Sequence, residues 1–376
     1  MNLLLIGQGP LPCIDEPFCA FPQLRTWSMY KSLLSVAPKY GWSVQLELLS
    51  LNADHSLILE NELIEALTWA DVIVTSGPYY PFFILPHIPD DTPVWLDFPS
   101  DPFADRDAKH LVDPLNEDEW ALVTALRQMA LQRADGLGVI SNRQKWVCYG
   151  ALLETQAHHV PVETIPIAFD FPTSIQQARN GNDFLLAGSA NAWLDLDAIK
   201  AHLQDKRVHC TGWNVPGYAS REIFPNWIQY NWLKPTELEK VIENCQFGIW
   251  ADRDGVESTL GSRTRALFYI WSGLTPIGTL HTELATELHH QDFLRTWKED
   301  WTSIDIPMAQ AYCQQQFSPQ TIYAPLHAWL QAPKRIHRTH TNELAKCNLE
   351  LREALSIIHN SPTWRIASRL HRLFKR

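Results

Sequence analysis

The chain has 376 residues, of which 45% are hydrophobic and 19% charged, and its net charge is −11. These proportions exclude a disordered chain, and the length suits about two or three domains, each with its own core. The negative charge argues against nucleic acid as the main partner.

The cysteines and the apolar runs of the sequence indicate in which cellular compartment the protein lies. The seven cysteines form no Cys-x-x-Cys pair, so the sequence signals neither a zinc site nor a disulfide framework. No apolar run reaches the ~18 residues of a transmembrane helix, and Met1–Pro12 lacks the basic region of a signal peptide. We therefore expect a cytoplasmic protein.

Strands and helices alternate along the first half of the chain. Short apolar runs predict strands, and apolar residues three and four apart predict helices. The expected strands are 2–6, 42–51, 72–75, 94–98, 138–140 and 164–167, and the expected helices are 24–39, 60–69, 117–133 and 141–150. Ser141 is the expected cap of the last helix, and the proline-broken stretch 79–89 reads as a loop. The alternation predicts a parallel sheet with helical crossovers in a first domain, 1–169.

A second series of strands and helices follows a polar linker, 170–182. The expected strands are 184–187, 208–211, 247–250 and 274–279, and the expected helices are 194–203, 236–244 and 262–273. Thr236 and Glu239 form the pattern of a capping box. We assign 183–333 to a second domain. Two open parallel sheets predict a cleft that faces the carboxyl ends of their strands.

The segment 252–279 carries the pattern with the clearest chemistry. A polar loop holds Glu257 and Gly261, a helix starts near Ser262, and Arg263 and Arg265 lie at that start. A helix N-terminus favours anions, and arginines suit phosphate oxygens, while a carboxylate in a solvent-facing loop can bind sugar hydroxyls. A nucleotide-sugar site needs this combination. The alternative is that both arginines are surface residues that pair with nearby acids.

This segment resembles the donor-site segment of GT-B glycosyltransferases, especially bacterial family 4-like enzymes, and it closes with the similar run Trp271–Pro276. Weaker similarities occur in the same order elsewhere, at 24–27, 134–140, 188–195 and 361–365. The resemblance implies two Rossmann-like domains that face a cleft. It also implies sugar transfer from a nucleotide-diphosphate donor to a glycan, lipid-linked or small-molecule acceptor, with retention of configuration and without a metal or other cofactor.

The resemblance also assigns residues to roles. The implied donor-binding residues are Gly7, Gly188, Ser189, Glu257, Gly261, Ser262, Arg263, Thr264 and Arg265. Glu257 and Asp101 are the implied catalytic residues, Asp101 as a base toward the acceptor hydroxyl, with turn formation as its alternative role. We expect Glu257→Ala to abolish transfer and to leave the fold intact. One position departs from the family, because Phe268 stands where a second acid usually binds the ribose.

Other patterns carry less information. The Gly7-Gln8-Gly9 turn fails as a dinucleotide fingerprint, because Pro12 occupies the third glycine position. Asp-x-Asp occurs at 105–107, 195–197 and 252–254, and only the last is a serious metal candidate. His158-His159 fits no ligand-spaced motif, and no nucleophile elbow of a hydrolase occurs.

A second hypothesis is a non-catalytic GT-B-like protein that binds a glycan or a partner glycosyltransferase. It is motivated by Phe268 and by the absence of Lys or Arg from 188–196, where many family 4 enzymes hold the diphosphate. Nucleotide binding separates the two hypotheses.

The C-terminal tail, 334–376, differs from the body in charge. It contains ten Lys and Arg against three Glu, a net charge of +7, which leaves −18 on 1–333. The pattern predicts a helix over 343–358 and a second helix that starts at Ser361-Pro362. In residues 361–376 apolar and basic faces lie side by side, which predicts either contact with an anionic membrane surface or docking on the first domain.

Overall fold

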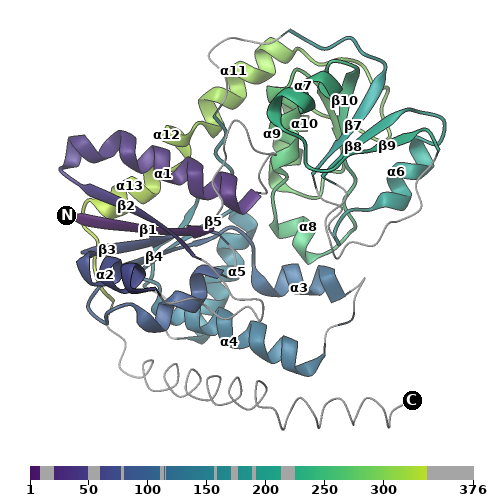
Figure 1. Cartoon of the computed structure of the whole chain (residues 1–376). Helices are drawn as coiled ribbons and strands as arrows, with labels where there is room; N and C mark the ends of the chain where they lie inside the picture. Colours follow the sequence, from purple (N-terminus) through teal and green to yellow (C-terminus); the bar gives the residue numbers. More distant parts are fainter. Residues whose placement is uncertain are drawn as a thin grey trace.

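The structure, a computed structural model, describes residues 1–8, 21–49, 60–77, 80–110, 114, 116–155, 159–170, 177–188, 192–212 and 225–336. It contains two six-stranded sheets with helices packed around them (Figure 1). The strand pairs are parallel in both sheets. The predicted architecture, two doubly wound α/β units, is confirmed.

The first sheet has the strand order β2-β1-β3-β4-β5-β6. Its strands are β1 (Asn2–Gln8), β2 (Ser43–Leu49), β3 (Val72–Thr75), β4 (Val94–Phe98), β5 (Gly136–Val139) and β6 (Val162–Thr164). The helices of this part are α1 (Phe21–Tyr40), α2 (Asn61–Trp69), η1 (Tyr80–His87), α3 (Pro102–His110), α4 (Glu117–Arg133) and α5 (Asn142–Glu154). Leu3 and Leu5 enter one hydrophobic cluster, Leu4 and Ile6 enter another, and all four are fully buried. This alternation fills both faces of the sheet, so helices cover both.

The second sheet has the order β12-β11-β10-β7-β8-β9. Its strands are β7 (Asp183–Ala187), β8 (Val208–Thr211), β9 (Trp227–Gln229), β10 (Cys245–Ile249), β11 (Thr275–Gly278) and β12 (Arg295–Thr296). Its helices are α6 (Leu196–His202), α7 (Pro235–Ile242), α8 (Val256–Leu260), α9 (Thr264–Trp271), α10 (Glu283–His290) and α11 (Ile306–Phe317). The order reverses between β7 and β10, and both of these strands end next to α9 and the loop before it, as the switch point of such a sheet requires.

The chain returns to the first domain after α11. Two short helices, α12 (Pro319–Ile322) and α13 (Ala324–Leu330), pack near α1 and the first sheet. Ser32 Oγ lies 3.2 Å from His327 Nε2, and the Trp329 ring lies 5.3 Å from the Trp95 ring. The predicted second domain, 183–333, stays a prediction, and these two helices within that range pack on the first sheet. Apolar spacing shows that a helix is buried but not which sheet buries it.

Two short helices, α3 and α8, occur where the sequence analysis placed no helix. Each follows the carboxyl end of a strand, and α3 packs against α8 across the two domains (Figure 1). The 3₁₀ helix η1 also replaces a predicted loop. The capping pattern of α7 is shifted by two residues, because Glu237 rather than Glu239 accepts the N-terminal N–H, that of Lys234, at 3.1 Å. Helices of one or two turns hold too few residues for a clear period.

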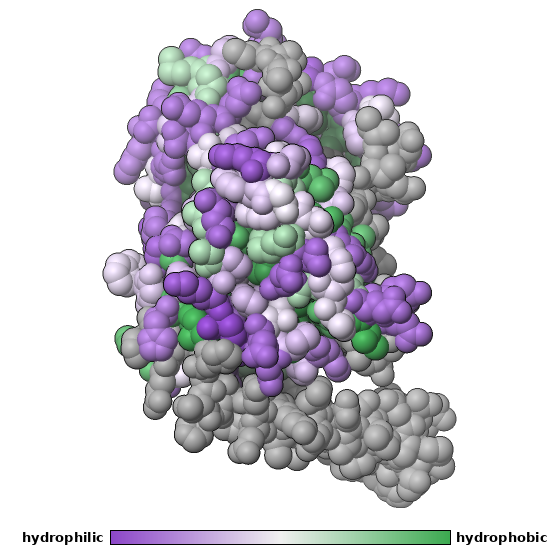
Figure 2. Space-filling view, turned by 90° about the vertical axis from the view of Figure 1, so that its left-hand side faces the viewer, coloured by the Kyte–Doolittle hydropathy of each residue, from purple (hydrophilic) through white to green (hydrophobic). Residues whose placement is uncertain are grey.

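Hydrophilic side chains are spread over the face of the molecule that carries α1 and α2, with smaller hydrophobic areas between them (Figure 2). Within the described residues, no helix is both long enough and apolar enough to cross a bilayer. Most of the tail, 337–376, lies outside the described residues, so its two helices and its membrane contact stay predictions.

Candidate functional site

Helix α9 is fixed against the ends of two central strands by Tyr269. The Tyr269 hydroxyl donates to Ile249 O at 2.9 Å and accepts from Ala187 N at 3.0 Å. Burial raises the pKa of Tyr269 to about 12, so the hydroxyl stays protonated and can donate. Gly248 allows this approach, because a Cβ there would lie 2.0 Å from Tyr269 Cγ. The start of α9 is thereby held at the carboxyl ends of β7 and β10.

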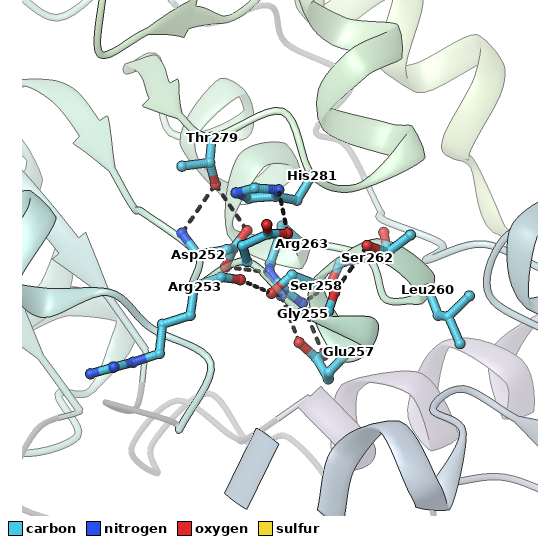
Figure 3. Close-up of polar contacts among 12 residues, drawn as sticks. Asp252, Arg253, Gly255, Glu257, Ser258, Leu260, Ser262, Arg263, Thr279 and His281 are labelled. Atoms are coloured by element: carbon cyan, nitrogen blue, oxygen red, sulfur yellow. Dashed lines mark hydrogen bonds and ion pairs between the residues drawn. The ribbon is translucent and has the colours of Figure 1, made fainter. Parts of the chain in front are cut away.

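Arg263, the residue before α9, is held between two carboxylates (Figure 3). Its Nε lies 2.7 Å from Asp252 Oδ1, and its Nη2 lies 2.7 Å from Glu257 Oε2. Nη1 adds a 3.1 Å bond to Glu257 Oε1, and the three side chains are buried. Burial alone would lower the pKa of Arg263, but Asp252 and Glu257 raise it above its ordinary value. The guanidinium is therefore a permanent cation within a closed ionic cluster.

This cluster corrects the predicted environment of Glu257. The side chain does not lie in a solvent-facing loop, because it is 7% exposed, belongs to α8 and binds Arg263 through both oxygens. Thr279 Oγ1 accepts from Asp252 N at 3.0 Å, which ties the same cluster to the end of β11. Two arginines were considered for phosphate binding. Arg263 fits the alternative hypothesis, in which the arginine pairs with nearby acids, but these ion pairs are buried and do not lie on the surface.

Arg265 has a different environment. Its Nη1 is buried, and no described residue accepts a hydrogen bond from it; the same is true of Ser262 Oγ. Burial lowers the pKa of Arg265, because the interactions with Tyr269, Asp252 and Glu257 offset only part of the cost of burying the charge. Buried polar groups normally have partners, so this pair of atoms needs an acceptor from outside the described chain. An anion would supply it.

The surroundings of Arg265 favour an anion as that acceptor. The N-cap residue of α9 is Arg263, whose side chain has no acceptor, so the first-turn N–H groups receive no side-chain cap. Thr264 is the first residue of α9, and Gly188 directly follows β7 with a φ of +90°, a left-handed conformation that favours glycine. A Cβ on Gly188 would lie 3.6 Å from Arg265 Nη2. Backbone, helix terminus and guanidinium converge here.

The remaining residues that were predicted to bind the nucleotide-sugar donor either have a structural role in the fold or lie outside the described residues. Gly261 ends α8, donates to Glu257 O at 2.8 Å, and has no room for a Cβ because that oxygen would be 2.8 Å away. Gly7 lets α1 approach β1, since a Cβ would lie 2.1 Å from Thr26 Cγ2. Ser189 lies outside the described residues, and its role stays a prediction.

In the first domain, Asp101 is buried and directly precedes α3. Its Oδ1 accepts from Phe103 N at 2.9 Å, and its Oδ2 lies 3.1 Å from Arg127 Nε. These contacts match the alternative that the sequence left open, a residue of turn chemistry, and the catalytic role of Asp101 stays a prediction. Of its neighbours, Asp105 is buried beside Lys109, whereas Asp107 is exposed.

The sequence analysis missed a second buried ion pair, between Arg25 and Asp97. Asp97 is fully buried, and both of its oxygens lie 2.6 Å from nitrogens of Arg25. Arg25 Nη2 also donates to Ile165 O at 2.9 Å, so the pair ties α1 to β4 and the chain after β6. An arginine within the apolar pattern of 24–39 was the available signal.

Phe268 lines a hollow between the domains. The hollow is formed by α1, the chain after β6, and α9, and its walls include Trp27, Phe169, Phe268 and Trp271. The Phe268 ring stacks on Trp271 with centroids 6.0 Å apart. The position that usually carries the ribose-binding acid is therefore part of an aromatic wall here.

No metal cluster is apparent in the described part of the chain, where no group of three His, Cys, Asp or Glu is placed to hold an ion. Asp252, the first acid of the serious Asp-x-Asp candidate, is paired with Arg263, and the Asp254 side chain is 94% exposed. Transfer without a metal stays a prediction.

Comparison with known proteins identifies the architecture. No family model and no curated protein matches this sequence. HepE from Anabaena, solved with UDP-glucose, aligns over 88% of this chain and 100% of its own, with a TM-score of 0.55 and 11% identity. An alpha-glucosyltransferase solved with UDP covers 88% of this chain and 94% of its own, with a TM-score of 0.48 and 13% identity. The chain has the GT-B fold of glycosyltransferases, as predicted.

Proposed function

We propose that this protein is a glycosyltransferase that moves a sugar from a nucleotide-diphosphate donor to a hydroxyl group of a glycan, lipid-linked or small-molecule acceptor. The observation that carries the proposal is the buried Nη1 of Arg265, which has no acceptor among the described residues, in a side chain that lies beside Gly188 at the start of α9. The GT-B fold supports it, because the site lies at the switch point of the second sheet.

Each residue near the start of α9 would have a distinct role. Arg265, Ser262 Oγ and the first-turn N–H groups of α9 would bind the diphosphate and stabilise the negative charge that develops on the leaving group. Arg263 would act through its ion pairs, because Asp252 and Glu257 fix the turn that leads into α9. The donor-binding and catalytic roles of Glu257 would then be indirect ones.

Nucleotide binding tests the proposal. Calorimetry with UDP, GDP, ADP and UMP should show micromolar binding of at least one diphosphate, and Arg265→Met should weaken it about 10- to 150-fold. This range corresponds to the ~1.5–3 kcal/mol of hydrogen bonds to charged groups. The matched control is Arg207→Met in the same domain, since the Arg207 side chain is 64% exposed. Its affinity should equal that of the unaltered protein.

The alternative function, a non-catalytic GT-B-like protein that binds a glycan or partner enzyme, remains motivated by Phe268 and its aromatic surroundings. Absence of binding to every diphosphate in the panel would favour it. We propose retention of anomeric configuration from the family 4 resemblance, and NMR of the first-formed product would show an inverted anomeric proton signal if this is wrong.

The proposed lipid-linked acceptor and the proposed membrane contact both involve the C-terminal tail. A lipid-linked acceptor would make a membrane contact of 361–376 useful, because each basic residue near an anionic surface contributes about 1 kcal/mol. Removal of 361–376 should leave a folded protein that no longer sediments with anionic liposomes at low salt. Equal sedimentation of both forms, or collapse of the shortened one, would favour docking on the first domain.

A further inference from the structure

The two domains are joined across the cleft by a small set of polar contacts between α5 and the segment from α8 to α10. Glu283, in the first turn of α10, accepts from two main-chain groups of the other domain, Asn142 N at 2.9 Å and Arg143 N at 2.7 Å. These N–H groups lie in the first turn of α5, where no intrahelical acceptor exists. A carboxylate of the second domain thus caps a helix of the first.

Side chains of the first domain also donate hydrogen bonds to carbonyl groups of the second domain. Arg143 Nη1 donates to His281 O at 2.6 Å and to Thr259 O at 3.3 Å, and Ser141 Oγ donates to Leu260 O at 2.6 Å. The last two acceptors are carbonyls of the final turn of α8. A helix C-terminus favours cations, so Arg143 complements α8 as Glu283 complements α5. Each domain therefore satisfies helix-end groups of the other only when the cleft is closed.

The contacts made by the side chains of Arg143 and Glu283 can open without a large penalty. The Arg143 side chain is 42% exposed and that of Glu283 is 29% exposed, so water can replace each partner when the domains separate. The ion pairs Arg25–Asp97 and Arg263–Glu257 differ, because their side chains are almost fully buried and separation would strand a charge. Each of those pairs also lies within one domain. The contacts around Arg143 are thus the reversible ones.

The contacts reach the nucleotide site through α8. This helix carries Glu257 in its first turn, Glu257 holds Arg263, and Arg263 directly precedes the helix that carries Arg265. At its other end, α8 is held by Ser141 and Arg143 of the first domain. Because α8 is only five residues long, displacement of one end displaces the other.

We propose that Arg143 and Glu283 form a reversible interdomain clasp that closes the cleft and positions α8, and with it the anion site at the start of α9. Both are positioning residues that act through Thr259, whose carbonyl accepts from Arg143, and through Glu257 at the other end of α8. The effect on nucleotide affinity rests on the proposed function, whereas the closure itself does not.

Amide hydrogen exchange of the full chain, followed by NMR, tests the closure directly. Protection of the Asn142 and Arg143 amides depends on Glu283, so Glu283→Ala should reduce it to the level of a free amide. Arg143→Ala, a second variant on the opposite domain, should enlarge the radius of gyration in small-angle scattering. The matched controls are Lys145→Ala and Glu163→Ala, which remove an ion pair of 3.4 Å within the first domain. The controls should change neither quantity.

Nucleotide affinity tests the positioning. In the protein that binds UDP or another diphosphate, both clasp variants should weaken binding by about 5- to 150-fold, the usual range of coupling between sites. Unchanged amide protection and radius of gyration in both variants would overturn the clasp. Changed closure with unaltered affinity would overturn the positioning role. If the unaltered protein binds no nucleotide, the proposed function fails, and exchange and scattering still decide the clasp.

Discussion

Buried arginines in the two domains differ in how completely the protein satisfies them. In the first domain, Arg25 donates to both oxygens of Asp97 and to two carbonyls, and in the second, Arg263 is bound by two carboxylates. Arg265, two residues further on, has a buried Nη1 with no acceptor among the described residues. A buried arginine with all of its partners in the protein supports the fold, whereas a buried guanidinium nitrogen without an acceptor favours a ligand, because a buried donor without a partner is costly.

The largest effect in this comparison is expected from loss of a paired arginine. Arg263→Ala would leave the carboxylates of Asp252 and Glu257 buried without a cation, and Arg25→Ala would leave Asp97 in the same state. Each should lower the free energy of unfolding by about 3–5 kcal/mol. Urea denaturation measures this, and a loss below ~1 kcal/mol would show that water compensates these acids.

A smaller loss is expected for Glu257→Ala. Arg263 keeps Asp252 as a partner in this variant, so the free energy of unfolding should fall by about 1–3 kcal/mol, the cost of an unsatisfied buried group. This replaces the expectation of an intact fold, since Glu257 is buried rather than solvent-facing. Thermal denaturation of Glu257→Ala and Glu257→Gln measures it, and equal midpoints for both variants and the unaltered protein would contradict the prediction.

Arg265→Met should have the opposite pattern. The substitution removes a guanidinium whose buried Nη1 has no acceptor among the described residues, and it keeps most of the volume, so we expect the unfolding free energy to stay within about 0.5 kcal/mol or to rise. Nucleotide affinity should fall as given above. A stability loss as large as that of Arg263→Ala would show that Arg265 has a structural partner, and the comparison would fail.

The smallest expected effect is a dependence of stability on pH that arises from His327 in α13. Burial lowers the pKa of His327 below 6.5, so the unfolded chain binds a proton at a higher pH than the folded one. The contribution of His327 to the free energy of unfolding should therefore be constant above pH ~6.5 and should fall as the pH decreases toward the lowered pKa, because protonation of His327 favours the unfolded state. His327→Gln should remove this part of the pH dependence in urea titrations; an unchanged slope between pH 5 and about 6.5 would exclude His327 as its source.

Local pattern determined most of the fold. The predicted strand 94–98 and helix 117–133 coincide with β4 and α4, and the predicted helix 262–273 contains α9, which is followed by Gly273 with φ +79°. These elements are regular and repeat apolar residues over several turns or strand positions, so the period is readable. Ser141 also caps α5 as predicted, with Gln144 N as donor. The order of motifs then sufficed to predict the GT-B architecture.

Contacts that form only in the folded chain decided the rest. Arg263 and Arg265 are both arginines at one helix start, and only the fold brings Asp252 and Glu257 to the first of them. The same holds for Arg25, whose partner Asp97 lies 72 residues away, and for Glu283, which caps α5 from 140 residues away. Sequence by itself shows which side chains can be charged. Which of these charges are neutralised inside the protein, and which remain for a ligand, is determined by partners that only the folded chain brings together.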